Sequence, residues 1–176
     1  MIPELVAKHA GLVMAHAAAI ASVLKPGELI CPFAVVTKGD NRQSIDFEAE
    51  TQDEAIVRAW ASLTEYQGYI DLWAMAREGL IAGESGKDDV LVVAAWTHGM
   101  PEPVVFSQRF CPTSRGDFSI TGPVMVRADL DAPSLRIVGE WFLQGVAEHP
   151  QGERWGSWLV PNKPLQPIAR EDARSS

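Results

Sequence analysis

The chain has 176 residues, of which 47% are hydrophobic and 22% are charged, and its formal net charge is -8 at pH 7. These values are ordinary for a globular domain and exclude wholesale disorder, and a chain of this length buries a core without needing a disulfide or a metal. The 15 basic residues are scattered among 23 acidic ones, so we expect no nucleic-acid partner. Nothing marks a domain linker, and residues 1–176 are predicted to form one domain.

Residues 1–25 are predicted to form an apolar N-terminal helix. The apolar run follows Glu4, is interrupted by His16 and is shorter than the about 20 residues of a bilayer span, so we expect neither a secretion signal nor a membrane anchor. The rest of the helix is rich in alanine all round. Such a helix is expected to lie between two layers or against a second subunit.

Two histidines share one side of this helix. His9 and His16 lie two turns apart, about 10 Å by helical rise, which is too far for one metal ion. We therefore expect no bound metal from this pair alone, and we treat both as candidate contacts to a ligand or partner.

Two strands and a helix follow. Residues 30–38 are predicted as a strand, and residues 44–50 alternate between apolar and acidic side chains, as in a strand with one wet face. Thr51 and Glu54 then form a capping box that starts a helix, and Gly68 is placed to end it.

Residues 88–110 are predicted to form a β-hairpin at the centre of the sheet, with two strands around a connection rich in glycine and proline. Residues 69–80 are predicted as a long strand that pairs with this hairpin. The run 90–96 is apolar without interruption, so it is expected to be a central strand covered on both faces. Residues 83–87 contain the Gly-Lys pair of a phosphate loop, but they lead into a strand and not a helix, which predicts a turn.

A candidate thiol nucleophile lies at the end of this hairpin. Cys111 follows the second strand and His98 lies in the connection, so the two could pair across the hairpin if register directs both to one face. Cys31 and Cys111 are far apart, and their spacing fits neither a disulfide framework nor a zinc knuckle. Reduced thiols in a cytoplasmic protein are the simplest interpretation.

The last predicted regular elements are a strand and a helix. Residues 118–127 form a strand whose Gly122 and Pro123 indicate an edge or a bulge. Asp131 starts a helix in which Gly145 is expected to allow close approach to a sheet. Residues 150–176 are predicted to be an extended C-terminal tail.

Two aromatic side chains in this tail are costly to leave in water. We expect Trp155 and Trp158 to pack onto the body of the domain or onto a partner.

The element order α-β-β-α-β-β-β-β-α predicts an α+β fold, with a largely antiparallel sheet of about five to six strands and helices packed against it. Convergent titratable groups are scarce, so we expect a noncatalytic binding or protein-interaction domain, homodimeric and without a cofactor. The alternative is a small hydrolase-type enzyme using His98 with Cys111. A second form of that alternative uses a metal held by His9, His16 and His149.

Overall fold

The computed structural model describes residues 1–84, 86–160 and 169–170. Its elements in chain order are α1 (Glu4–Ala21), β1 (Phe33–Lys38), β2 (Asn41–Asp46), α2 (Gln52–Tyr66), β3 (Leu72–Gly83), β4 (Gly86–Thr97), β5 (Val104–Cys111), the 3-10 turn η1 (Thr113–Arg115), β6 (Ser119–Arg127), α3 (Ala132–Glu148), α4 (Arg154–Trp158) and β7 (Ala169–Arg170). Six strands pair antiparallel in the order β2-β1-β3-β4-β5-β6, and the short β7 lies parallel to β6. The predicted α+β class and element order are confirmed.

Local sequence signals account for several of these boundaries. The Thr51 hydroxyl accepts the amide of Glu54 at 3.2 Å, and the Asp131 carboxylate accepts the amide of Ser134 at 2.9 Å, so both predicted helix starts are confirmed. β3 and β4 pair without a break as far as Gly83 opposite Gly86, which confirms the predicted turn. The register between β5 and β6 shifts, as expected for a bulge.

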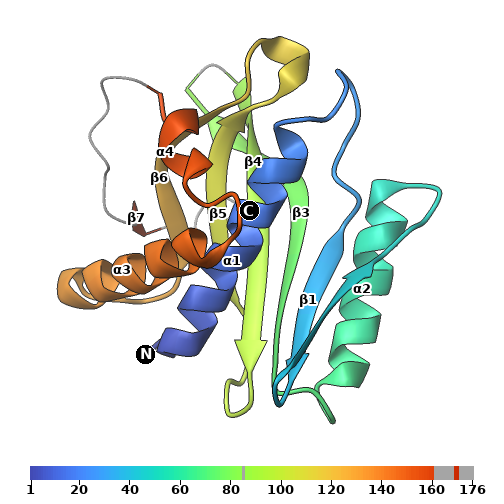
Figure 1. Ribbon diagram of the computed structural model, residues 1–176, viewed down its shortest axis with the longest axis vertical. Coiled ribbons are helices and arrows are strands. Elements are labelled where there is room, and N and C mark those ends of the chain that lie inside the picture. Colours follow the sequence, from blue (N-terminus) through green and yellow to red (C-terminus); the bar gives the residue numbers. More distant parts are fainter. Residues whose placement is uncertain (85, 161–168, 171–176) are drawn as a thin grey trace.

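One face of the sheet is covered by α1, α3 and α4 (Figure 1). α1 packs over β3 and β4, and α3 packs against α1 and reaches β5, where Phe142 stacks on Phe106 with ring centroids 5.3 Å apart. The apolar surroundings that the N-terminal helix requires are therefore supplied within one chain.

Two glycines allow the backbones of α1 and α3 to touch. A Cβ on Gly11 would overlap the carbonyl oxygen of Phe142, and a Cβ on Gly145 would overlap the carbonyl oxygen of Lys8. The expectation that Gly145 approaches a sheet is wrong, because this side of α3 faces α1. The glycine still permits a close approach, but to a helix.

The extended tail predicted for residues 150–176 is wrong at its start. Residues Arg154–Trp158 form α4, and Trp155 and Trp158 are buried in the core beneath it. Trp158 meets Phe118 edge to face at 5.4 Å, and Trp155 meets Phe142 at 6.5 Å. Residues three apart in a helix lie on the same side, so one helical turn buries both aromatic rings. A helix this short gives no periodic pattern in the sequence, so it could not be predicted. Residues 161–168 and 171–176 of the predicted tail lie outside the described residues.

The other face of the sheet carries α2. This helix buries Ala59 and Leu63, and Trp60 meets Trp73 of β3 edge to face at 5.8 Å. The other three α-helices pack on the opposite face, so within the described residues no helix covers this face of β5 and β6, and α2 covers only part of β4. We expected helices over both faces of the central strand 90–96; they cover one face fully and the other in part.

Candidate functional site

A hollow of about 250 Å³ lies on the part of the sheet that α2 leaves open. We call it the sheet-face hollow. The residues that line it come from α2 and from four neighbouring strands: Trp60, Met75, Arg77, Gly79, Leu80, Ile81, Val90, Val92, Ala94, Val105, Ser107 and Arg127.

Strand register explains why two arginines meet this hollow. Arg77 on β3 lies opposite Val92 on β4, which in turn lies opposite Ser107 on β5. In the next row, Val105 on β5 lies opposite Arg127 on β6. Directly opposed residues of antiparallel strands share a face, so the two guanidinium groups rise on either side of a floor that is mainly apolar.

Gly79 leaves the space beside Arg77. It lies opposite Val90, and a Cβ at this position would come 3.0 Å from Nη1 of Arg77 and 3.5 Å from a methyl carbon of Val92. Any larger residue at position 79 would therefore occupy the volume next to the guanidinium. The hollow exists in part because residue 79 is a glycine and has no side chain to fill this space.

The charge on Arg77 is only weakly compensated. Its Nη1 donates to the carbonyl oxygen of Glu78 at 3.2 Å, and within the described residues no carboxylate forms an ion pair with it. Burial lowers the pKa of Arg77, as does the like charge of Arg127, while Asp53 at the start of α2 opposes the shift. A cation in this setting is stabilised by an incoming anion.

A third arginine on the same face differs from Arg77 because it forms an ion pair. Arg109 is held by Asp88, with Nε 3.1 Å from the carboxylate oxygen. Among the residues that line the hollow, Ser107 supplies the one hydroxyl, and none is a histidine, cysteine, aspartate or glutamate. This set of side chains can bind an anion, but it lacks the paired base that would activate a serine.

The opposite face brings two histidines together. Nδ1 of His16 lies 2.9 Å from Nε2 of His149, which caps the end of α3, and the amide of Gln151 donates to Nδ1 of His149 at 3.0 Å. Nδ1 of His149 therefore accepts, its Nε2 carries the proton, and Nδ1 of His16 accepts in turn. Both rings are assigned as neutral on this pattern.

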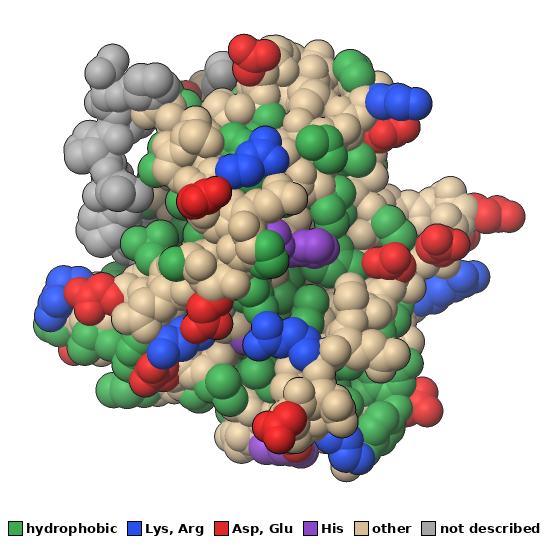
Figure 2. All heavy atoms as spheres, viewed as in Figure 1, with side chains coloured by type: hydrophobic (Ala, Val, Ile, Leu, Met, Phe, Trp, Pro, Cys, Tyr) green, Lys and Arg blue, Asp and Glu red, His purple; other side chains and the backbone are tan. Residues whose placement is uncertain are grey.

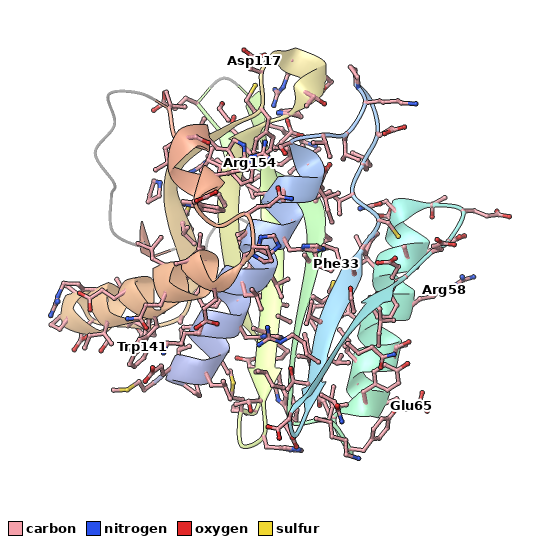
Figure 3. All side chains as sticks on the ribbon, in the orientation of Figure 1. Phe33, Arg58, Glu65, Asp117, Trp141 and Arg154 are labelled. Carbon is pink, nitrogen blue, oxygen red and sulfur yellow. The ribbon has the colours of Figure 1, made fainter. Side chains whose placement is uncertain are left out.

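The surroundings of the pair favour the neutral forms. Figure 2 shows histidine side chains at the centre of this face, among hydrophobic ones, and Phe33 points from β1 toward α1 in Figure 3. The Phe33 ring meets His16 edge to face at 5.2 Å. Burial lowers the pKa of His16, with Asp46 opposing, and burial followed by the proximity of His16 lowers the pKa of His149.

His9 does not join this pair. Its Nε2 donates to the carbonyl oxygen of Val35 at 2.9 Å, its side chain is 3% exposed, and burial is the main cause that lowers its pKa to about 4. The described residues contain no group of three or more histidine, cysteine or acidic side chains that could hold a metal ion. The metal-dependent alternative built on His9, His16 and His149 therefore does not have the geometry it requires.

The structure also separates His98 from Cys111. β4 and β5 pair antiparallel, so His98 lies just beyond one end of the hairpin and Cys111 at the other, about 30 Å apart by strand rise. His98 instead lies 3.9 Å from a carboxylate oxygen of Asp71, and the thiol of Cys111 approaches the carbonyl oxygen of Pro112 at 3.8 Å. A nucleophile–base pair of these two residues is not formed.

The sheet-face hollow was not predicted from the sequence. Arg77 was visible as a charge within the predicted strand 69–80, two and four residues after Met75 and Trp73 on the same face. An arginine that follows apolar residues on the same face of a strand indicates a polar site on a buried face. The partner across the hollow, Arg127, could not be found without the strand register.

Comparisons of the chain with models of protein families, with curated proteins and with solved structures find no match. Among the helices of the described residues, none combines the length and apolar character needed to cross a membrane. The geometry of the site is therefore the basis for assigning a function.

Proposed function

We propose that this chain is a noncatalytic binding domain whose ligand is a small molecule held in the sheet-face hollow. The observation that carries the proposal is Arg77, a partly buried cation with one hydrogen bond, beside space left by Gly79. A volume of about 250 Å³ is slightly below the about 300 Å³ at which typical ligand pockets begin, which suits a small ligand. The floor belongs to paired strands, so the site is rigid before the ligand arrives.

A cavity-filling variant tests this proposal. Gly79→Val places methyl groups against Val90 and Val92, and a matched control, Gly156→Val, adds the same side chain on α4, where a Cβ meets no atom within 4 Å. A panel of small acids, amines and alcohols is titrated into each protein by isothermal calorimetry. We expect at least one class to bind the wild-type and Gly156→Val proteins and to bind Gly79→Val at least about tenfold more weakly. Equal binding by all three proteins contradicts the proposal.

We also propose that the chain forms a homodimer through β2. The apolar segments that suggested self-association are buried within one chain, so the proposal now rests on this strand. β2 is an edge strand and is exposed along most of its length. Two copies paired antiparallel about Ser44 would place Arg42 opposite Asp46 of the second copy, twice, and opposite charges across strands are favourable.

The proposed location is the cytoplasm, without a nucleic-acid or membrane partner. Two observations support it: Cys31 and Cys111 are both free thiols, as in reducing compartments, and the net charge of -8 disfavours phosphate-rich surfaces. Burial and the nearby carboxylates of Asp46 and Glu48 raise the pKa of Cys31, which lowers its thiolate fraction at neutral pH.

A further inference from the structure

We propose that the ligand of the sheet-face hollow is a monocarboxylate with a compact apolar body. This inference rests on the proposed function and adds the charge and chemical class of the ligand. Its basis is the placement of a partly satisfied guanidinium at one side of an apolar floor.

The cationic end of the hollow fits a carboxylate. A guanidinium presents five N–H donors in a planar fork, and Arg77 uses one nitrogen for the carbonyl oxygen of Glu78. The space that Gly79 leaves borders Nη1 of Arg77, which gives one of its two N–H groups to Glu78, so an anion there can accept the other N–H of Nη1 together with one from Nη2. Paired N–H donors match the two oxygens of a carboxylate, and such charge-assisted bonds are about twice as strong as neutral ones.

The remainder of the hollow fits an apolar group. Val90 and Ala94 are buried in the floor, and Val92, Val105 and Trp60 line it as well. Its volume of about 250 Å³ is slightly below the about 300 Å³ at which typical ligand pockets begin, which suits a small acid such as octanoate. Transfer of such a chain out of water stabilises the complex at about 0.8 kcal/mol per buried methylene.

The contacts at Arg77 favour one negative charge over two, because the second arginine of the lining, Arg127, lies across the apolar floor on β6 and not beside Arg77. The floor is apolar, and Ser107 supplies its one hydroxyl, so each further charge on the ligand would lose hydration with few new hydrogen bonds. Asp53 already offsets part of the positive charge at Arg77. A phosphate monoester, which carries close to two charges at neutral pH, is therefore expected to bind less well than a carboxylate.

Four probes of equal chain length test the assignment by isothermal calorimetry: octanoate, octan-1-ol, octylamine and octyl phosphate. They are titrated into the wild-type protein, Arg77→Met and Arg136→Met. Arg136 is a matched control because it lies on α3, exposed and paired with Glu140. We expect octanoate to bind the wild-type and Arg136→Met proteins most tightly of the four, and Arg77→Met to lose at least about tenfold in affinity for octanoate but not for octan-1-ol.

The outcomes separate this inference from the proposed function. If octan-1-ol binds as tightly as octanoate and Arg77→Met binds both normally, the carboxylate assignment is overturned while the hollow remains a binding site. Tighter binding of octyl phosphate than octanoate overturns the preference for a single charge. If none of the four probes binds the folded wild-type protein, the monocarboxylate is rejected, and the wider panel with Gly79→Val decides on the binding site itself.

A second substitution covers the case in which Arg77→Met fails to fold. Arg77→Lys keeps the charge and loses the planar fork, so the octanoate affinity is expected to fall while the preference for octanoate over octylamine persists. An unchanged octanoate affinity in Arg77→Lys would show that the fork does not hold the carboxylate, and would overturn the bidentate contact.

Discussion

At the scale of single residues, the histidine of α1 that faces the sheet links stability to pH. His9 is buried, donates to the carbonyl oxygen of Val35 and has its pKa lowered to about 4, mainly by desolvation. In the unfolded chain its pKa returns to about 6.5, so between these values the unfolded state binds more protons. The contribution of His9 to stability is therefore complete above pH 6.5 and is lost as the pH falls toward 4.

This linkage predicts a measurable loss of stability in mild acid. From pH 7.5 to pH 5, His9 alone is expected to lower the free energy of unfolding by about 2 kcal/mol. Urea unfolding at both pH values measures the effect, and His9→Gln is expected to remove most of it. His16 and His149 shift in the same direction, so a smaller slope remains. The exposed His98 supplies the control: a His98→Gln variant with the wild-type slope supports the prediction, and a His9→Gln variant with that slope contradicts it.

At the scale of elements, the contact between α1 and α3 depends on two glycines. A Cβ on Gly145 would overlap the carbonyl oxygen of Lys8, an atom of the backbone that a side-chain rotation cannot move. Gly145→Ala is therefore expected to force the helices apart and to lower the free energy of unfolding by about 2 kcal/mol or more, despite the better helix propensity of alanine.

A glycine in another helix gives the matched comparison. A Cβ on Gly156 of α4 would meet no atom within 4 Å, so Gly156→Ala is expected to leave stability unchanged or to raise it by up to about 1 kcal/mol. Chemical denaturation of both variants measures the difference. Equal stability of Gly145→Ala and wild type would mean that α1 and α3 do not pack as closely as their backbones indicate.

An element could be predicted when the residues that form it lie close together in the sequence. The cap at Thr51 involves an amide three residues away, so the local sequence alone indicates it. Gly145 and Lys8 are far apart in the chain, and no local pattern could say that a helix and not a strand would face that glycine. For the candidate site, the sequence shows Arg77 as a charged residue that follows apolar residues on one face of a predicted strand. How much of the sheet α2 covers depends on tertiary packing, which sequence periodicity does not reveal.

At the scale of the whole molecule, the two faces of the sheet are unequal. Three helices and their aromatic side chains close one face, while α2 closes the other over β1 and β3 and leaves the sheet-face hollow beyond. The hollow also carries two cations, although the chain as a whole is acidic. This arrangement favours a small anionic ligand over a second sheet as the cover, because a two-fold contact through this face would bring arginines of both copies together.

The free edge at β2 is the place that we propose for a second copy. Pairing about Ser44 places Arg42 against Asp46 of the other copy, so Arg42→Glu is expected to create two repulsive contacts and to shift a dimer toward monomer. The double variant Arg42→Glu with Asp46→Arg exchanges the charges and is expected to restore the dimer. Size-exclusion chromatography with light scattering at micromolar concentration measures each state. A wild-type protein that is monomeric there contradicts self-association, and a dimer that withstands Arg42→Glu alone places its interface away from β2.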